Sequence, residues 1–479
     1  MCLFLPAPLA LAFDTAPHYD LTRTVLAERG FGGDAIGIAQ VENWLTDYYS
    51  SSPTIAKTKG AEFEKLHCDN LYTTAEVAAY WARLLANVRA AVREAARDGD
   101  ETALLAALGM SLHVVQDYYA HSNWVETHPR GAFDFYRTET YLSAPPAPDA
   151  RLFTGKYPAD RKLGPSGGAV PAGALAHGDY RTGLNHDSPV RPGWDEAYVF
   201  AYAASHELVE LVEKWTEEAR PGFWERVRSL TLAAADRAAL DFDLRAAQNL
   251  SMWIRVRDAD GHWKGDKSGL ARFFDTFTSK WVGRDSSRFV KLSADGRLLT
   301  RLAAGLYTRE AAPALPKTKP FALNRRAVLV RTTRIAETDD VGRLEPAIDP
   351  SGKADFYAVF TIGGQLYRER VIQNEKSAID PWFEIHFVDA GLAAVPVNIA
   401  VLDEDDWDAG GKYRDDVIDI NPQPGKTGLD LVFHPLDGSL TGDVTGVHAT
   451  RATAFLTTGA KPDKNRAAFS CFIWQAALR

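Results

Sequence analysis

The segment HVVQDYYAH holds three potential metal ligands at intervals of four residues, namely His113, Asp117 and His121. Positions four apart lie about 40° from each other around an α-helix, so these side chains would form one polar stripe. The surrounding sequence, ALGMSLHVVQDYYAHSNWVE, is apolar at almost every other position, which is typical of a buried helix. A charged Asp117 would be strongly destabilised there without a positive partner. We therefore expect the stripe to be buried and satisfied by a positive partner, either a paired side chain or a metal ion.

The segment HELVE repeats this spacing with His206 and Glu210. Imidazole and carboxylate groups suit zinc, and facing helices can bring two such stripes together in the core of a bundle. On a helix surface, the same spacing would give only a weak ion pair or hydrogen bond. Two further segments, PHYDLT with His18 and LHCDNL with His67 and Asp69, place an imidazole and a carboxylate two residues apart. Together these segments predict a metal site in the N-terminal part of the chain.

Helical periodicity dominates the chain up to about residue 307, because apolar residues recur every three or four positions. The clearest segments are TAEVAAYWARLLANVRAAVREAAR, TALLAALGMSLHVVQDYYA and EAYVFAYAASHELVELVEKW. Proline, glycine, serine and aspartate interrupt this pattern at about 142–193, which predicts a long irregular excursion. Within it, His186 and Asp187 in GLNHDSP either contact substrate from a lid or begin an Asx-turn, and the Asx-turn is the favoured interpretation.

The sequence pattern changes after residue 310. The segment AAPALPKTKPFALN, residues 311–324, has a proline every few positions and predicts an interdomain linker. From 325 to 479, short β-rich runs such as AVLVRTTRIAE, DFYAVFTIGG and VPVNIAVLDED alternate with turn residues, which is the pattern of a β-sandwich. The predicted fold class is therefore multi-domain, with an all-α helical bundle over residues 1–310 followed by an all-β sandwich over residues 325–479.

Acidic residues interrupt the strand pattern of the sandwich in two places, DPSGKADFY and LDEDDWDAGGKYRDD. Mutual repulsion makes such loops costly without a cation, and oxygen-rich ligand sets without histidine suit calcium. The alternative is a solvated acidic turn. The expected calcium-binding residues are Asp349, Asp355, Asp403, Asp405 and Asp416.

The composition describes an acidic, globular chain with a net charge of −9 and a hydrophobic fraction of 46%. This acidity disfavours duplex nucleic acid as a partner. The three cysteines are too few for a disulfide framework. No apolar stretch reaches the ~20 residues that span a bilayer, so we expect no transmembrane segment and only peripheral membrane contact. The N-terminal MCLFLPAPLALAFDTA resembles the apolar part of a secretory signal, although it lacks a preceding basic residue.

Five segments carry a resemblance to a known family: PHYDLT, LHCDNL, LGMSLHVVQDYYAHSNWVE, GLNHDSP and HELVE. Through them, over residues 18–210, the chain resembles the zinc-dependent phospholipase C and single-strand nuclease superfamily, and within it the Het-C-like branch. The resemblance implies a helical domain with two or three zinc ions, of which Asp117 would bridge two. His113 would bind the first metal together with the LHCDNL segment, with Asp69 as ligand or base and His67 as the alternative.

The resemblance also implies ligands for the other two metals. The second would be bound by His206 and Glu210, with His121 or His128 as a third ligand, because the histidine after HxxxD follows sooner here than is usual in these enzymes. His18 would bind the third metal.

The N-terminus departs from the family pattern. In the phospholipases and nucleases a mature N-terminal tryptophan also binds the third metal, whereas this sequence has no tryptophan near its start. Cleavage after Ala12 would expose Phe13, whose backbone groups could substitute. We accordingly expect a secreted or extracytoplasmic, monomeric protein.

The sandwich resembles a C2-type domain, whose first loop pairs two aspartates six residues apart and whose third loop begins Asp-x-Asp. Both patterns are present, and IDPWFEIHF resembles the strand that follows the NPxW turn of this family. The third loop is longer than usual, so Asp415 could replace Asp416, or Asp408 could contribute. Calcium between these loops would attach the domain to anionic phospholipid headgroups.

These expectations combine in a zinc-dependent phosphodiesterase, similar to phospholipase C, that a calcium-binding C2-like domain delivers to a phospholipid membrane. Clustered divalent ions activate water for phosphodiester hydrolysis, and Asp69 would orient or deprotonate that water, which with Asp117 makes the expected catalytic pair. One alternative is a single-strand nuclease of the same superfamily. The other is a non-enzymatic, Het-C-like membrane-associated or toxin protein with structural metal.

Overall fold

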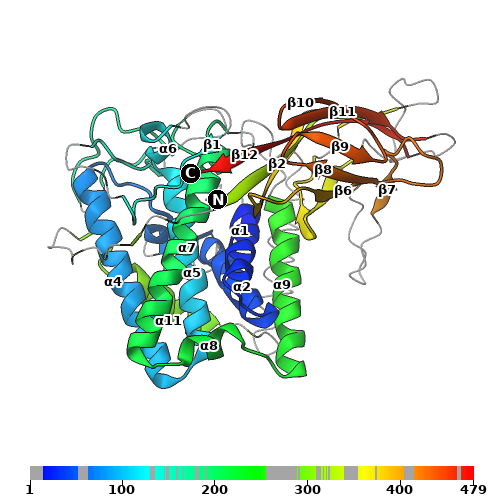
Figure 1. Cartoon of the computed structure of the whole chain (residues 1–479). Coiled ribbons are helices and arrows are strands. Elements are labelled where there is room, and N and C mark those ends of the chain that lie inside the picture. The colour runs from blue at the N-terminus through cyan, green and yellow to red at the C-terminus, as the bar shows by residue number, and fades with distance from the viewer. Residues whose placement is uncertain are drawn as a thin grey trace, which may run out of the picture. The chain divides into compact units, whose positions relative to one another are not determined.

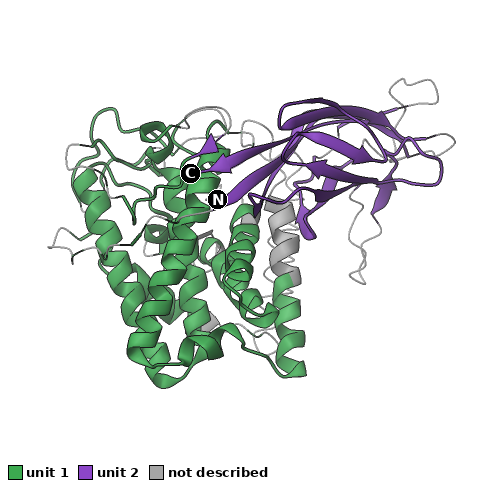
Figure 2. Ribbon diagram, viewed as in Figure 1, with its two compact units in different colours: residues 1–129, 137–251, 271–321 green, residues 130–136, 252–270, 322–479 purple. Residues whose placement is uncertain are grey.

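The computed structural model divides the chain into two compact units (Figure 2). Unit 1 comprises residues 1–129, 137–251 and 271–321, and unit 2 comprises residues 130–136, 252–270 and 322–479. The residues that the structure describes are 15–51, 63–129, 135–144, 146, 150–157, 160–164, 167–177, 183–187, 189, 191–254, 289, 292–308, 314, 316, 318–319, 321, 324–338, 354–372, 375–403, 415–460 and 465–479.

Unit 1 is helical (Figure 1). Its elements are α1 Thr15–Glu28, α2 Gly33–Ser51, the 3-10 helix η1 Glu64–His67, α4 Thr74–Asp98, α5 Glu101–His121, α6 Trp124–Thr127, α7 Trp194–Ala219, α8 Phe223–Arg228, α9 Ala234–Ile254 and α11 Leu292–Ala303. α5 packs against α2, α4 and α7, and every one of its residues from 104 to 121 is buried. The predicted burial of the ligand stripe on this helix therefore holds. No helix in the described part is apolar over a length sufficient to cross a bilayer.

The start of α4 shows why the helices begin where they do. The side chain of Thr73 accepts a hydrogen bond from the backbone N–H of Glu76, and the Glu76 carboxylate accepts one from the backbone N–H of Tyr72. This arrangement is similar to a capping box, except that the carboxylate binds the N–H of the residue before the N-cap. The Thr73 side chain satisfies a backbone donor that the first helical turn leaves without a partner. At the other end, Gly99 adopts a φ of 75°, and Asp100 then caps the N-terminus of α5. Two local signals thus fix the turn between α4 and α5.

Gly109 allows α5 to approach α2. A Cβ atom at this position would lie 2.3 Å from the carbonyl oxygen of Ala39, so only glycine fits. The close approach brings Asn43 and Asp47 of α2 against the polar stripe of α5.

The described part of the excursion is attached to the C-terminal end of α5 by backbone hydrogen bonds. The N–H of Gly155 donates to the carbonyl of His121, and the N–H of His186 donates to the carbonyl of Ala120. On the other side, the N–H of Thr154 donates to the carbonyl of Leu71. The excursion is therefore built into unit 1 beside the ligand stripe, and its side chains can contribute to the site.

Unit 2 contains two sheets whose strands pair antiparallel, apart from one short parallel pair. The first sheet has the order β10-β11-β12-β2-β5, with β1 parallel to β12, and the second has the order β4-β3-β6-β8-β9, with β7 on β6. The strands are β1 Phe135–Tyr136, β2 Arg325–Glu337, β3 Phe356–Ile362, β4 Gln365–Arg368, β5 Ser377–Asp389, β6 Val395–Asp403, β7 Asp416–Ile418, β8 Leu429–His434, β9 Ser439–Gly442, β10 Val447–Ala449, β11 Ala452–Thr458 and β12 Ala467–Leu478.

The core of unit 2 follows the alternation of the strands. Along β12, Phe469, Cys471 and Ile473 are buried in one cluster with alternate residues of β2, β3 and β6, whereas the residues between them are partly exposed. The predicted combination of a helical N-terminal part and a two-sheet C-terminal part is confirmed. One detail differs: β1 lies within the range predicted to be helical but pairs with β12, because the chain crosses to unit 2 at residues 130–136.

Candidate metal centre

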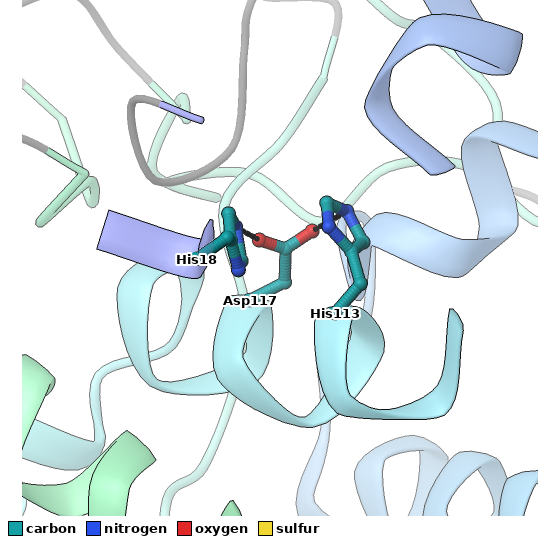
Figure 3. A group of neighbouring side chains, drawn as sticks. All are labelled: His18, His113 and Asp117. Carbon is teal, nitrogen blue, oxygen red and sulfur yellow. Dashed lines mark ion pairs between the residues drawn. The ribbon is translucent and has the colours of Figure 1, made fainter. Parts of the chain in front are cut away.

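Asp117 stands at the middle of a buried group of histidines from three elements. Figure 3 shows its carboxylate between His18 and His113. The Oδ1 atom of Asp117 lies 2.9 Å from Nε2 of His18, and the Oδ2 atom lies 3.1 Å from Nε2 of His113. His67 adds its Nδ1 atom at 2.9 Å from the same Oδ2. One carboxylate of α5 therefore faces imidazoles from α1, η1 and α5 itself.

Asp47 of α2 lies near the same two imidazoles. Its Oδ1 atom lies 3.7 Å from Nε2 of His113 and 3.8 Å from Nδ1 of His67. The two imidazole nitrogens are themselves 3.3 Å apart. Zinc with bonds of about 2.0–2.1 Å in tetrahedral geometry separates its ligand atoms by roughly 3.3 Å. The distances of His67 and His113 from each other, from Asp47 and from Asp117 bracket this value, so the compact group of Asp47, His67 and His113 fits a zinc ion, and Asp117 lies beside it.

The protonation states strengthen this fit. Burial lowers the pKa of His113 to about 3, against the opposing effect of Asp117, so this imidazole is neutral at physiological pH. Burial by itself would raise the pKa of Asp117, but His113, His121 and His18 outweigh it and hold that pKa well below its usual range. A neutral imidazole nitrogen thus faces an ionised carboxylate. Such a pair of acceptors is complementary to a cation.

A second donor group lies next to the first. Asp69, His121 and His177 each place one donor atom within 4.8 Å of the others. Asp187 adjoins them, with Oδ1 at 3.1 Å from Nε2 of His121 and Oδ2 at 3.9 Å from Nε2 of His177. All four residues are buried, and one carboxylate oxygen each of Asp69 and Asp187 is buried without a hydrogen-bond partner. Two members of the group, His177 and Asp187, come from the excursion.

His121 is oriented by the backbone. Its Nδ1 atom donates to the carbonyl of His67 at 2.6 Å, which directs Nε2 toward Asp187. Burial alone would lower the pKa of His121, but Asp187 and Asp69 outweigh it and hold that pKa well above its usual value. Without metal, a proton on this imidazole balances the two carboxylates. Burial also raises the pKa of Asp69, and His121 opposes that effect only in part.

The structure does not bring His206 and Glu210 into either group. Nδ1 of His206 accepts a hydrogen bond from Arg29 at 3.0 Å, and Nε2 lies 3.0 Å from the Glu28 carboxylate, to which it donates. Both ring nitrogens are therefore engaged, and neither offers a lone pair to a metal. Glu210 is 60% exposed and lies 3.9 Å from Arg29. The structure therefore places these two predicted second-metal ligands apart from the two donor groups, because Glu28 of α1 and Arg29 after it bind the His206 ring.

The residues that the sequence left as alternative ligands also lie in different places. His67 faces Asp117 in the first group, and Asp69 belongs to the second group, so the LHCDNL segment contributes to both. His121 is in the second group, whereas His128 stacks on Trp124 with ring centroids 3.9 Å apart.

Sequence reasoning missed Asp47 and His177, and it favoured a turn for Asp187. Asp47 lies in an apolar helical pattern without a histidine four residues away. The only sign of a function was the free-energy cost of burying its carboxylate. His177 lies in the irregular excursion, where no periodicity aligns it with other ligands. The Asx interaction at GLNHDSP does exist, since the side chain of Asn185 accepts from the N–H of Asp187. The Asp187 carboxylate nevertheless faces His121.

The aspartates predicted to bind calcium lie in unit 2. Asp403 and Asp416 are partners in the β6–β7 pairing, and Oδ1 of Asp403 accepts a hydrogen bond from the N–H of Asp355 at 2.5 Å. Asp415 accepts a hydrogen bond from the hydroxyl of Tyr357. These four residues thus gather at one end of a sheet, although the compact donor groups found among the described residues all lie in unit 1. Three of the predicted residues, Asp349, Asp405 and the alternative Asp408, lie outside the described residues.

Comparisons with known proteins bear on parts of the chain. The family model of the VWA7 N-terminal domain matches residues 61–135, the segment that carries His67, Asp69, His113, Asp117 and His121. A comparison with curated proteins finds no matching sequence.

Solved structures match over about a third of the chain. They include human GIVD cytosolic phospholipase A2 in complex with methyl gamma-linolenyl fluorophosphonate, at 9% identity and a TM-score of 0.20 over 33% of this chain and 18% of that chain. A C2 domain protein from Ramazzottius varieornatus matches at 10% identity and a TM-score of 0.22, over 32% of this chain and 90% of that chain. The C2A and C2B domains of extended-synaptotagmin 2 match at 15% identity and a TM-score of 0.21, over 35% of this chain and 48% of that chain. The chain thus spans less than a fifth of the phospholipase, and at these TM-scores the similarity carries no functional conclusion.

Proposed function

We propose that unit 1 is a zinc-dependent phosphodiester hydrolase that acts on phospholipid headgroups, as a phospholipase C does. One observation carries this proposal: two compact, buried donor groups, one of Asp47, His67 and His113 and the other of His18, His113 and Asp117, meet at His113 with donor types and spacings that suit zinc. His18 on the other oxygen of Asp117, and the group of Asp69, His121, His177 and Asp187, supply donors for one or two further ions. The donor types are those that zinc prefers.

Zinc bound at these groups would polarise a phosphoryl oxygen and lower the pKa of a water molecule. The residues of the chain supply orientation and proton transfer. Asp117 is buried on α5 and presents its two oxygens to different imidazoles, so it can connect two sites. The Asp69 carboxyl has a pKa raised by burial, and such a carboxyl is a strong proton acceptor once it is ionised. We assign Asp69 the role of general base and Asp117 the role of shared ligand.

Unit 2 serves in this proposal as a calcium-dependent, C2-like membrane anchor, which makes the protein a peripheral membrane protein on the extracytoplasmic side. Asp355, Asp403, Asp415 and Asp416 gather carboxylates at one end of the β3–β6–β7 arrangement. Carboxylate oxygens are the ligands of calcium, and calcium held there would link the acidic loops to anionic headgroups. Binding to phosphatidylserine vesicles with and without calcium tests this part. The Asp403→Asn variant should lose binding, whereas a variant of the exposed Asp389 should keep it.

Elemental analysis and a hydrolysis assay test the enzymatic proposal. The zinc-loaded protein should release phosphorylated headgroups from phosphatidylcholine vesicles, and the His113→Ala variant should lose both zinc and activity. His448 is an exposed histidine of β10, so the His448→Ala variant is the matched control and should keep both. Digestion of single-stranded DNA without headgroup release would identify a nuclease instead. Tightly bound zinc without either activity would contradict catalysis and favour a structural metal.

A further inference from the structure

Two buried amide side chains lie behind the histidines of the first donor group. Gln116 of α5 and Asn43 of α2 are both fully buried. Oε1 of Gln116 accepts hydrogen bonds from Nδ1 of His18 at 2.7 Å and from Nδ2 of Asn43 at 3.1 Å. Oδ1 of Asn43 lies 3.4 Å from Nδ1 of His113. Each amide therefore contacts the far side of one imidazole.

Ser205 of α7 fixes which way round the Gln116 amide lies. The hydroxyl of Ser205 donates to the carbonyl of Ala201 at 2.7 Å, so its oxygen is left as an acceptor. The Nε2 group of Gln116 lies 3.2 Å from that oxygen and can donate to it, whereas a flipped amide would place two acceptors in contact. With the Ser205 hydroxyl donating to Ala201, Gln116 presents its oxygen to His18.

The same logic extends to Asn43. Its Nδ2 group donates to Oε1 of Gln116 and to the hydroxyl oxygen of Thr22 at 2.9 Å, so its Oδ1 atom is the one that faces His113. The amides thus place a hydrogen on Nδ1 of both His18 and His113. In the neutral imidazole, a hydrogen on Nδ1 leaves Nε2 with a lone pair. These are the two nitrogens that lie 2.9 and 3.1 Å from the oxygens of Asp117.

We propose that Gln116 and Asn43 are positioning residues that set the tautomers of His18 and His113, so that both imidazoles are held ready to bind metal before any metal arrives. The proposal rests on the metal centre proposed above. Metal-binding histidines commonly donate their other N–H to an oxygen acceptor, and loss of such an acceptor typically lowers metal affinity by about 10- to 100-fold. Here two acceptors are coupled to each other, and through Thr22 and Ser205 they tie α1 and α7 to α2 and α5.

The tautomers can be measured in metal-free protein labelled with 15N-histidine. The signals of His18 and His113 are assigned by their absence from the His18→Asn and His113→Asn proteins. In the parent protein both imidazoles should carry hydrogen on Nδ1. The Gln116→Met variant keeps the side-chain length but has no acceptor of comparable strength, so His18 should shift toward the Nε2–H form. Zinc affinity, measured by competition with a chromophoric chelator, should fall by about 10- to 100-fold.

Two further variants separate positioning from packing. Gln116→Glu keeps an acceptor opposite His18 and should restore the Nδ1–H tautomer. Ser111→Ala removes another buried polar group of α5, whose hydroxyl donates to the helix carbonyl of Ala107, and should leave the tautomers and zinc affinity unchanged. If Gln116→Met does not fold, Ser205→Ala removes the acceptor that orients the amide and should produce a mixture of tautomers.

An unchanged His18 tautomer in Gln116→Met, or in Ser205→Ala where that variant is used, would overturn the proposal. So would a zinc affinity within twofold of the parent. These outcomes differ from failure of the proposed function, because the tautomers are read in the absence of metal and substrate. A protein with the expected tautomers that hydrolyses no phosphodiester would contradict the enzymatic activity and leave the amide network in place.

Discussion

Replacing Gly109 by alanine tests whether the close approach of α5 to α2 builds the metal centre. Helix propensity alone favours alanine by about 1 kcal/mol. The new Cβ atom, however, would lie 2.3 Å from the carbonyl oxygen of Ala39, whereas ordinary van der Waals contact begins at 3.4 Å. The difference is 1.1 Å, and a backbone carbonyl in a helix cannot rotate away. We therefore expect the steric effect to exceed the propensity gain and to lower the free energy of unfolding by about 1–3 kcal/mol.

The same displacement should act on the donor group. Asp47 lies about two helical turns beyond Ala39 on α2. Its Oδ1 atom is already 3.7 and 3.8 Å from the nitrogens of His113 and His67, farther than these nitrogens lie from each other or from Asp117. A further separation of about 1 Å would leave this carboxylate beyond the edge of a tetrahedral zinc site. Zinc affinity should fall by about tenfold or more, because mutation of residues that only hydrogen-bond to a metal ligand already causes losses of this size.

Urea unfolding and chelator competition measure the two effects. Gly296 of α11 provides the matched control, because a Cβ atom at that position would meet no atom within 4 Å. Gly296→Ala should raise the free energy of unfolding by about 0.5–1 kcal/mol and leave zinc affinity unchanged. A Gly109→Ala protein that is as stable as the parent and binds zinc equally well would refute the argument that the helix approach positions Asp47.

Three further predictions concern other parts of unit 1. Burial raises the pKa of Glu207 from 4.5 to about 7, so protonation stabilises the fold below about pH 4.5 and this contribution is lost as the pH rises through 7. In urea unfolding, the stability of Glu207→Gln relative to the parent should therefore increase by on the order of 3 kcal/mol from acidic to alkaline pH, and a pH-independent difference would contradict it. His206→Asn should leave the zinc content unchanged in elemental analysis, since both ring nitrogens are already engaged, and loss of an ion would reverse that assignment. Thr73→Ala should lower the free energy of unfolding by about 1 kcal/mol through loss of the α4 cap, and an unaltered thermal transition would show that this N-cap contributes nothing.

The α5 stripe could be predicted because its evidence is local. Spacing and apolar surroundings placed His113 and Asp117 on one buried helix face, and the structure has them there. HELVE has the same local pattern, yet His206 is engaged by Glu28 and Arg29, which lie far away in the sequence. Periodicity identifies a shared face but carries no information about the residues that this face meets.

The contribution of the excursion could not be predicted for a related reason. His177 and Asp187 reach His121 because backbone hydrogen bonds attach Gly155 and His186 to the end of α5. Backbone pairing of this kind depends on the path of the chain rather than on side-chain pattern. In unit 2, by contrast, the alternation of apolar residues indicates strands with one buried and one exposed face, so the two sheets could be predicted from the sequence.

The two donor groups should depend on metal to different degrees, because the pKa values of His113 and His121 are shifted in opposite directions. His121 has a raised pKa and can carry a proton between Asp187 and Asp69 when metal is removed. His113 has a pKa of about 3 and remains neutral, with Nε2 at 3.1 Å from an oxygen of Asp117. Chelation should therefore accelerate backbone hydrogen exchange around His18 and His113 more than around residues 183–187. Equal acceleration in both regions would mean that the charge balance of the first group does not depend on a bound cation.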